Sequence, residues 1–341
     1  MDYLDKITAF ANPPYNAIGS TLFLSYIILA LYCTTSIVLS LYRQYNSISS
    51  QKPSKDQTDQ QLIAIQNARK RHVKIYAFLA SISFATLSYH MLSFLINSYV
   101  QWASNKWLLI RTLSREHLRG WMWDSTLFES FAKELVSDGA STVWTQAAIL
   151  TTWFWNVWMA GKAQKHGFTM ETMAPYIMLS QILPISFAAA LFIIQLHLSA
   201  LGASPISAEK ETKTDETPQP KPKKPYKRTT LTLPTILLNA ALICLPPLRN
   251  HPAFVPLVLL TRLILFMPYS DRISLRDEQV VQSISISGGF VVANFAMLRK
   301  VVGWRDVLGV LRVGGEAVKT LVWDAQISAV VYAVLGWGGG V

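Results

Sequence analysis

"IGSTLFLSYIILALYCTTSIVLSL", residues 18–41, contains no charged side chain. A second stretch, "IYAFLASISFATLSYHMLSFLINSYV" at residues 75–100, has His90 as its one possible charge. An α-helix needs about 20 predominantly apolar residues to cross a hydrocarbon core of about 30 Å, and both stretches reach that length. The two stretches therefore predict membrane-crossing helices in a multi-pass membrane protein.

The remaining apolar segments extend this pattern along the chain. Only 15% of the 341 residues are charged and 51% are hydrophobic, whereas soluble proteins have about 25% charged residues. A third span is expected at about 140–160, and a fourth at about 173–200, where Pro175 and Pro184 interrupt the apolar run. Further candidates are 231–248 and 253–268 (two tight spans or one re-entrant pair), 279–298 and 317–337. We expect an all-α, polytopic transmembrane helix bundle with seven or eight spans.

Composition divides the chain into three parts. Residues 1–201 are expected to form an N-terminal membrane bundle with four spans, and residues 231–341 a set of C-terminal membrane helices. Between them, residues 202–230 contain "EKETKTDETPQPKPKKPYKR", a basic linker too polar to support a core and expected to be disordered. Asp2 and Asp5 lie where a signal peptide would be basic, so we expect the first span to stay in the membrane.

The formal charge of +11 is explained by segments next to the predicted spans. Lys and Arg cluster in "NARKRHVK" (67–74) and "KPKKPYKR" (221–228). Basic residues at membrane ends interact with anionic lipid headgroups, so the bilayer rather than nucleic acid is the expected partner. The endoplasmic reticulum is the default membrane because the sequence carries no sorting signal.

Motifs for metals and cofactors are missing from the sequence. There is no Asp-rich run to hold magnesium and a diphosphate, no P-loop, no dinucleotide-binding fingerprint and no HExxH. Cys33 and Cys244 both lie in apolar stretches, away from any His or Cys at metal-ligand spacing. We therefore expect no metal and no cofactor.

A segment rich in acids and aromatics, "WMWDSTLFESFAKEL" at residues 121–135, separates the second and third predicted spans. One interpretation is a solvated helix whose Trp121 and Trp123 belong to an interfacial aromatic belt. The other is a catalytic site, in which Asp124 or Glu129 stays protonated because apolar walls disfavour the charged form.

Such an acid would protonate an epoxide or an alkene of a lipophilic substrate. Aromatic faces would then stabilise the resulting carbocation, by about 0.5–2 kcal/mol each, without trapping it as a nucleophile would. Trp144 and Trp153 on the third span are candidates to line the cavity, although the aromatic belt explains them as well.

Two charges fall inside apolar segments. Arg262 lies within "LVLLTRLILF" and Asp324 within "VKTLVWDAQISAVVYAV". Charges inside a membrane cost several kcal/mol unless they are paired or face water, so both are functional candidates, with Asp324 as a second possible acid. Alternatively the two pair with each other, or Arg262 reaches the interface. His90 is a further cavity candidate, although such a residue usually hydrogen-bonds between helices.

Three segments together give a resemblance: "WMWDSTLF" (121–128), "DGASTVWTQ" (138–146) and "MAPYIMLSQILPISFAAALF" (173–192). The chain resembles the fungal membrane-bound terpene cyclases of the ascochlorin and paxilline type, which act in meroterpenoid and indole-diterpene secondary metabolism. The likeness covers roughly residues 75–200, and the C-terminal third matches by hydropathy alone. It implies metal-independent, acid-initiated cyclisation of a prenylated, epoxidised or unsaturated precursor.

Two other functions stay open from the sequence. Arg262, Asp324 and the proline-interrupted fourth span are also typical of a transporter, here for a small hydrophobic metabolite. The basic linker at 202–230 instead fits a non-catalytic scaffold that holds other pathway enzymes at a membrane.

Overall fold

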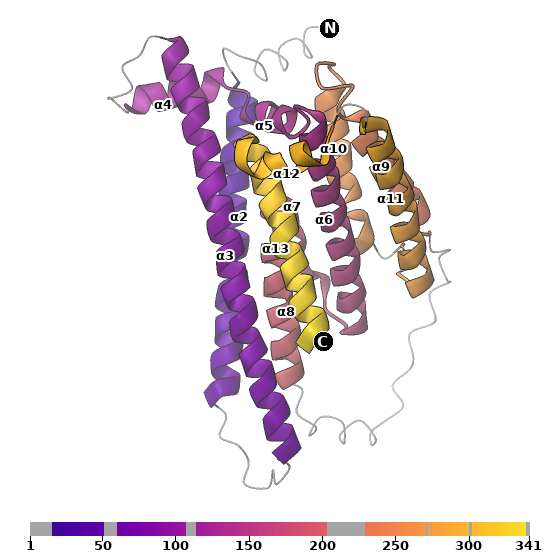
Figure 1. Ribbon diagram of the computed structural model, residues 1–341. Coiled ribbons are helices and arrows are strands. Elements are labelled where there is room, and N and C mark those ends of the chain that lie inside the picture. Colours follow the sequence, from indigo (N-terminus) through magenta and orange to yellow (C-terminus); the bar gives the residue numbers. More distant parts are fainter. Residues whose placement is uncertain are drawn as a thin grey trace, which may run out of the picture.

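The computed structural model describes residues 16–50, 60–106, 114–202, 229–270, 272–273, 275–299 and 302–338, and these residues are all-helical, without a β-strand (Figure 1). The predicted linker at 202–230 lies almost entirely outside them. The helices are α2 (Ala17–Ser50), α3 (Gln60–Asn105), α4 (Arg115–Asp124), α5 (Leu127–Leu135), α6 (Gly139–Lys165), α7 (Met170–Ile182), α8 (Ile185–Gly202), α9 (Thr232–Cys244), α10 (Phe254–Ile264), the 3₁₀ turn η2 (Met267–Tyr269), α11 (Asp277–Leu298), α12 (Trp304–Val313) and α13 (Glu316–Gly338).

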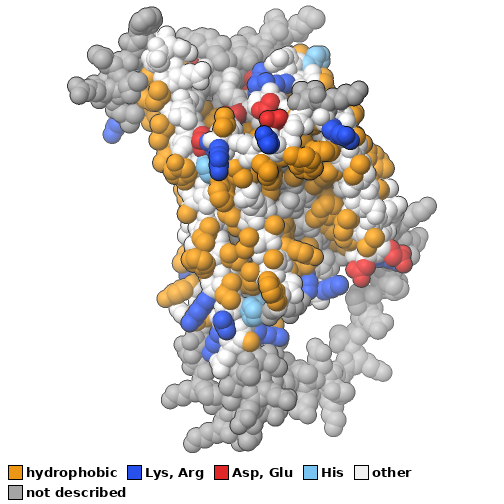
Figure 2. Space-filling model, in the orientation of Figure 1, with side chains coloured by type: hydrophobic (Ala, Val, Ile, Leu, Met, Phe, Trp, Pro, Cys, Tyr) orange, Lys and Arg blue, Asp and Glu red, His pale blue; other side chains and the backbone are white. Residues whose placement is uncertain are grey.

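Four of the described helices are long and apolar enough to cross a membrane: α2, α3, α11 and α13. They correspond to the predicted spans at 18–41, 75–100, 279–298 and 317–337. Large apolar side chains on their outer faces are exposed, among them Ile28 and Phe78, as expected for helices that face lipid. Hydrophobic side chains cover the middle of the visible face, and Lys and Arg gather toward its two ends (Figure 2). Seven or eight spans are not confirmed for the described residues.

Helix α6 coincides with the predicted third span but lies inside the bundle instead of facing lipid. Many of its side chains are buried, including Gln146, Trp153 and Asn156. The carbonyl oxygen of Gln146 accepts a hydrogen bond from Asn294 of α11 at 2.7 Å, and Trp153 donates to Ser283 at 3.2 Å. Because protein surrounds α6, polar contacts between helices replace the apolar surface that a lipid-facing span needs.

The segment predicted as a fourth span forms two antiparallel helices, α7 and α8, joined at Leu183 and Pro184. The ring centroids of Tyr176 and Phe192 lie 5.6 Å apart, whereas sixteen residues of continuous helix would separate them by about 24 Å. Pro184 signals the interruption in the sequence, but it does not reveal that the chain turns back. The result is a re-entrant hairpin whose turn lies within the bundle.

The C-terminal helices pack against the N-terminal ones. Helix α13 contacts α3, α6 and α8; α9 contacts α10 and α11, and both α11 and η2 contact α6. At 13 and 11 residues, α9 and α10 are each shorter than the roughly 20 residues that a full span requires. Their lengths favour the re-entrant pair over two tight spans.

Candidate functional site

The turn of the α7–α8 hairpin exposes the carbonyl end of α7, because the last carbonyls of a helix have no partner within it. The backbone oxygen of Gln181 accepts a hydrogen bond from the Tyr26 hydroxyl at 2.7 Å and one from Arg262 Nη1 at 3.3 Å. The guanidinium of Arg262 thus lies at the negative end of the α7 dipole, where a cation is stabilising.

Asp324 of α13 lies on the other side of the same turn, at the N-terminus of α8. Its carboxylate accepts hydrogen bonds from the amide groups of Ile185 and Ser186, each at 3.0 Å, and from the Ser186 hydroxyl at 2.7 Å. An anion at a helix N-terminus satisfies free amide groups and the positive end of the dipole. The two intramembrane charges found in the sequence therefore do not form an ion pair with each other. Arg262 serves α7 and Asp324 serves α8.

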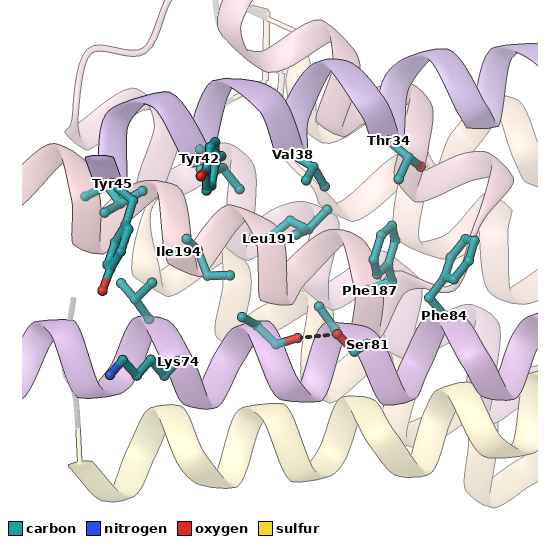
Figure 3. Close-up of a pocket in the computed structure, with 15 residues that line it drawn as sticks. Thr34, Val38, Tyr42, Tyr45, Lys74, Ser81, Phe84, Phe187, Leu191 and Ile194 are labelled. Carbon is teal, nitrogen blue, oxygen red and sulfur yellow. Dashed lines mark hydrogen bonds between the residues drawn. The ribbon is translucent and has the colours of Figure 1, made fainter. Parts of the chain in front are cut away.

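An apolar groove lies along the outer side of α8, between α2 and α3 (Figure 3). Its volume of about 620 Å³ falls within the range of about 300–1,000 Å³ typical of small-molecule sites. Its floor comes from α8, through Phe187, Leu191, Ile194 and Leu198. The side walls come from α2 and α3 and include Val38, Tyr42, Tyr45, Ala77 and Phe84.

The ends of the groove differ in chemistry. Phe84 and Phe187 close one end, with ring centroids 5.4 Å apart, and Tyr45 and Lys74 lie at the other (Figure 3). None of the side chains that line it is a carboxylic acid. The groove suits a long apolar molecule, but the described residues place no acid in it to start a cyclisation.

A second group of polar side chains gathers where α3, α5 and α13 meet. His90 Nδ1 lies 2.7 Å from an oxygen of Glu316, whose other oxygen accepts a bond from Lys319 at 3.0 Å. Glu134 accepts a hydrogen bond from the backbone amide of Ala317 at 2.9 Å. We call His90, Glu134, Glu316 and Lys319 the acid–base cluster.

Glu134 is half-buried in this cluster, and its environment favours the protonated form. Burial raises its pKa, and the nearby Glu316 adds to this, although the Ala317 amide and Lys319 act in the opposite direction. On the same face of α5, one turn away, Phe131 makes an edge contact with Phe94, with ring centroids 5.3 Å apart. The Glu134 carboxyl group therefore lies one turn from an aromatic pair, on the same face of α5.

Asp124 and Glu129 lie in other surroundings. Asp124 accepts hydrogen bonds from Lys106 and, at 3.0 Å, from the Trp102 indole. Burial raises the pKa of Asp124, but the hydrogen bonds from both partners and the charge of Lys106 outweigh it and lower the pKa below its ordinary value of 3.8. Glu129 forms a partly exposed ion pair with Lys133 at 2.7 Å. The contacts of Asp124 favour its carboxylate form, and Glu129 is paired at the surface of α5.

The four tryptophans chosen from the sequence do not share one cavity. Trp121 packs with the side chains around α3 and α12, and its indole donates to Ser98 at 3.3 Å. Trp123 stacks under the guanidinium of Arg119. Trp144 donates to the Val307 carbonyl at 2.7 Å, and Trp153 is fully buried next to α9 and α11. Each side chain has its own partner, and none lines the groove.

Comparisons with known proteins add no relatives to this geometry. No family model matches the chain, and neither a curated protein nor a solved structure matches it.

Sequence reasoning did not select Glu134, Glu316 or Lys319, and a signal was available for one of them. Leu127, Phe131 and Glu134 follow one another at i, i+4 and i+7, which places Glu134 on the apolar face of α5. The contact of His90 with Glu316 joins residues 226 positions apart, so no local pattern could reveal it.

Proposed function

We propose that this protein binds a lipophilic, chain-shaped small molecule from the bilayer in the groove between α2 and α3 and carries it through the membrane. The observation behind this proposal is the groove itself, with about 620 Å³ of space, aromatic walls and no acid. Its four-residue floor on α8 gives it the length of a prenyl or acyl chain rather than the shape of a compact polar metabolite.

Carriage is favoured over static binding because α8 has two roles. One face of α8 is the floor of the groove, and its first residues are the broken end that Asp324 holds. Interrupted helices with charges at their ends are the elements that secondary transporters use around a midplane site. A shift of α8 at its N-terminus would move the groove floor directly.

A transfer assay tests this function. Vesicles that contain the full chain and a fluorescent prenyl alcohol in one leaflet should equilibrate the probe faster than protein-free vesicles. Val38→Trp should slow this transfer, because Val38 lines the groove and is accessible. Leu39→Trp is the matched control, since the equally exposed Leu39 lies outside the groove. Equal transfer with and without protein would refute carriage.

Cyclisation of a prenylated substrate is the second candidate, and Glu134 is the observation that favours it. A half-buried carboxyl group whose pKa is raised, near the Phe94–Phe131 pair, has the properties of an acid that protonates an alkene or epoxide. The resemblance of 121–128, 138–146 and 173–192 to the fungal membrane-bound terpene cyclases supports the same reaction.

Product analysis separates the two functions. The chain would be expressed in a host fed an epoxidised prenyl precursor, and Glu134→Gln should abolish any cyclic product. Glu129→Gln serves as the control, because Glu129 is an acid on the same helix that is paired with Lys133. Undiminished cyclisation by the Glu134 variant would remove this residue as the acid, and the absence of any cyclic product from the wild type would leave carriage alone.

A further inference from the structure

Helix α3 carries a line of polar side chains on its inward face. His72, Tyr76, Ser83, Thr86 and His90 follow at spacings of three, four or seven, which keeps them on one side of a helix. From His72 to His90 the line extends about 27 Å along the axis, close to the roughly 30 Å of a hydrocarbon core. Most residues between them on this face are apolar, so the line is distinct from its surroundings.

Helix α13 faces α3 with a matching line. Glu316, Thr320, Asp324 and Ser328 follow at intervals of four residues. Two contacts fix the register of the antiparallel pair: His90 lies against Glu316, and Ser83 bonds at 2.6 Å to Ser186, which donates to Asp324. In this register Ser328 falls between the levels of Ser83 and Tyr76. The two lines together extend from the acid–base cluster to the basic end of α3.

Helix α8 adds His197 to this line, at the end where His72 and Tyr76 of α3 lie. The imidazole of His197 stacks on His72, with ring centroids 5.5 Å apart, and lies 5.9 Å from the Tyr76 ring. His197 and Tyr76 are almost fully buried. The line thus ends in two imidazoles and a phenol that contact one another.

Four polar atoms along this line are buried without a hydrogen-bond partner: His72 Nδ1, Tyr76 Oη, His197 Nε2 and Ser328 Oγ. Buried polar groups are paired in the large majority of cases, because an unpaired group costs about 1–3 kcal/mol. Of eleven such atoms among the described residues, four therefore lie along this one line. Hydroxyl and imidazole groups that are free to accept and donate are the parts of a proton relay.

We propose that this line conducts protons across the bundle, with Asp324 as its central acceptor. A proton that enters at His90 and Glu316 passes Thr320 to the Asp324 carboxylate. It leaves through Ser328, Tyr76, His197 and His72, and every group returns to its starting protonation state. Net transfer is one proton, which requires no redox partner.

The surroundings of Asp324 explain how this relay is gated. The groups that face its carboxylate are Ser186 and the Ile185 amide of α8, with Ser83 of α3 behind them and the charge of Arg262 on α10 nearby. The gap beside Asp324, lined also by Thr86, Pro184 and Thr320, has no room for a water molecule. The line is therefore closed here and opens when α8 moves.

This inference does not depend on the ligand of the groove, but it links the two features through α8. Protonation of Asp324 weakens its bonds to the first amides of α8, and α8 also forms the groove floor. If carriage occurs as proposed, it is then coupled to proton movement.

A flux assay tests the relay. The full chain is reconstituted in phosphatidylcholine vesicles with and without geranylgeraniol, valinomycin imposes a potassium diffusion potential, and an internal dye reports pH. Wild type should acidify the vesicles faster than protein-free controls in at least one of the two lipid mixtures. Asp324→Asn, which retains an acceptor for the α8 amides, should reduce this flux to the control rate.

Tyr76→Phe is the sharper variant, because it removes a hydroxyl that has no hydrogen-bond partner and should leave the fold intact. It should also reduce the flux to the control rate. Tyr89→Phe, an identical change on the exposed face of α3, should conduct like wild type. No flux in either lipid mixture, or a folded Tyr76→Phe protein with full flux, would overturn the relay. The two proposals can fail separately. If the wild type conducts protons but Val38→Trp transfers the prenyl probe as fast as wild type, the groove is not the ligand site and the proton relay still stands.

Discussion

Asp324 and Ile185 are 139 positions apart in the sequence, yet the Asp324 carboxylate accepts a hydrogen bond from the Ile185 amide at 3.0 Å and thereby caps α8. This contact ties the turn of a re-entrant hairpin to a helix that crosses the bundle. It explains why a mostly apolar segment keeps an aspartate, since the free amides of a helix start inside a membrane must find a partner.

Removing this cap should destabilise the protein more than removing an exposed acid. Asp324→Ala deletes three hydrogen bonds and leaves buried amides unpaired, so we expect a loss of about 3 kcal/mol in the free energy of unfolding. Asp324→Asn should lose less, because one carbonyl oxygen remains. Asp277→Ala in the exposed first turn of α11 is the control, with a change under about 1 kcal/mol. Thermal unfolding in detergent measures all three, and equal losses would contradict the cap.

Glu134 should make stability fall as pH rises. Its pKa in the folded protein is raised above the ordinary value of 4.5, so its contribution is present below that pH and is lost as pH rises through the folded pKa. Glu134→Gln cannot ionise and keeps an acceptor for the Ala317 amide. Its unfolding temperature relative to wild type should therefore increase from about pH 4 to about pH 7. A difference that does not vary with pH would contradict the raised pKa of Glu134.

Asp124 should show the opposite dependence. Its pKa is lowered by Lys106 and Trp102, so its contribution is present above about 3.8 and is lost as pH falls through the folded pKa. Because the ion pair is partly exposed, Asp124→Asn should cost at most about 1 kcal/mol at neutral pH. The cost should vanish in acid. Glu129→Gln, which breaks an exposed i,i+4 pair, should change stability by about 0.3–0.5 kcal/mol.

Gly315 has no room for a side chain. A Cβ placed there would overlap the Glu134 carboxyl group, so Gly315→Ala should displace this side chain from the Ala317 amide and cost about 1 kcal/mol. The double variant Gly315→Ala, Glu134→Ala should lose less than the sum of the two single changes, because the clash disappears with the carboxyl group. At Gly309 nothing lies within 4 Å of an added Cβ, and alanine there should stabilise α12 by up to about 1 kcal/mol. Additive losses at Gly315 and Glu134 would show that the two do not touch.

The sequence predicts well those parts of the fold that face lipid. The segments at 18–41 and 75–100 are predicted as spans because lipid requires a continuous apolar surface. The interior helix α6 and the hairpin α7–α8 are harder to predict, because protein contacts such as Asn294 with Gln146 replace that surface. Pro184 predicts where the helix is interrupted but not which way the chain continues. The contact that holds the start of α8 comes from Asp324, in a distant part of the chain.

The same reasoning applies to the candidate site. The sequence identified Arg262, Asp324 and His90 as charges that require partners, and the structure supplies a partner for each. The partners come from helices far away in the sequence, so the sequence alone could not identify them. Glu134 belongs to the same acidic segment but was not chosen, although its spacing from Leu127 and Phe131 places it on the apolar face of α5.

Photo-cross-linking with peptide mapping tests the groove most directly. A diazirine-bearing geranylgeraniol analogue would be irradiated in vesicles that contain the full chain. Labels should concentrate on the groove segments 34–45, 73–84 and 187–198, and Val38→Trp should reduce them while Leu39→Trp does not. Labels spread evenly over the outer faces of α2, α3 and α11, with no difference between these two variants, would contradict a ligand site in the groove.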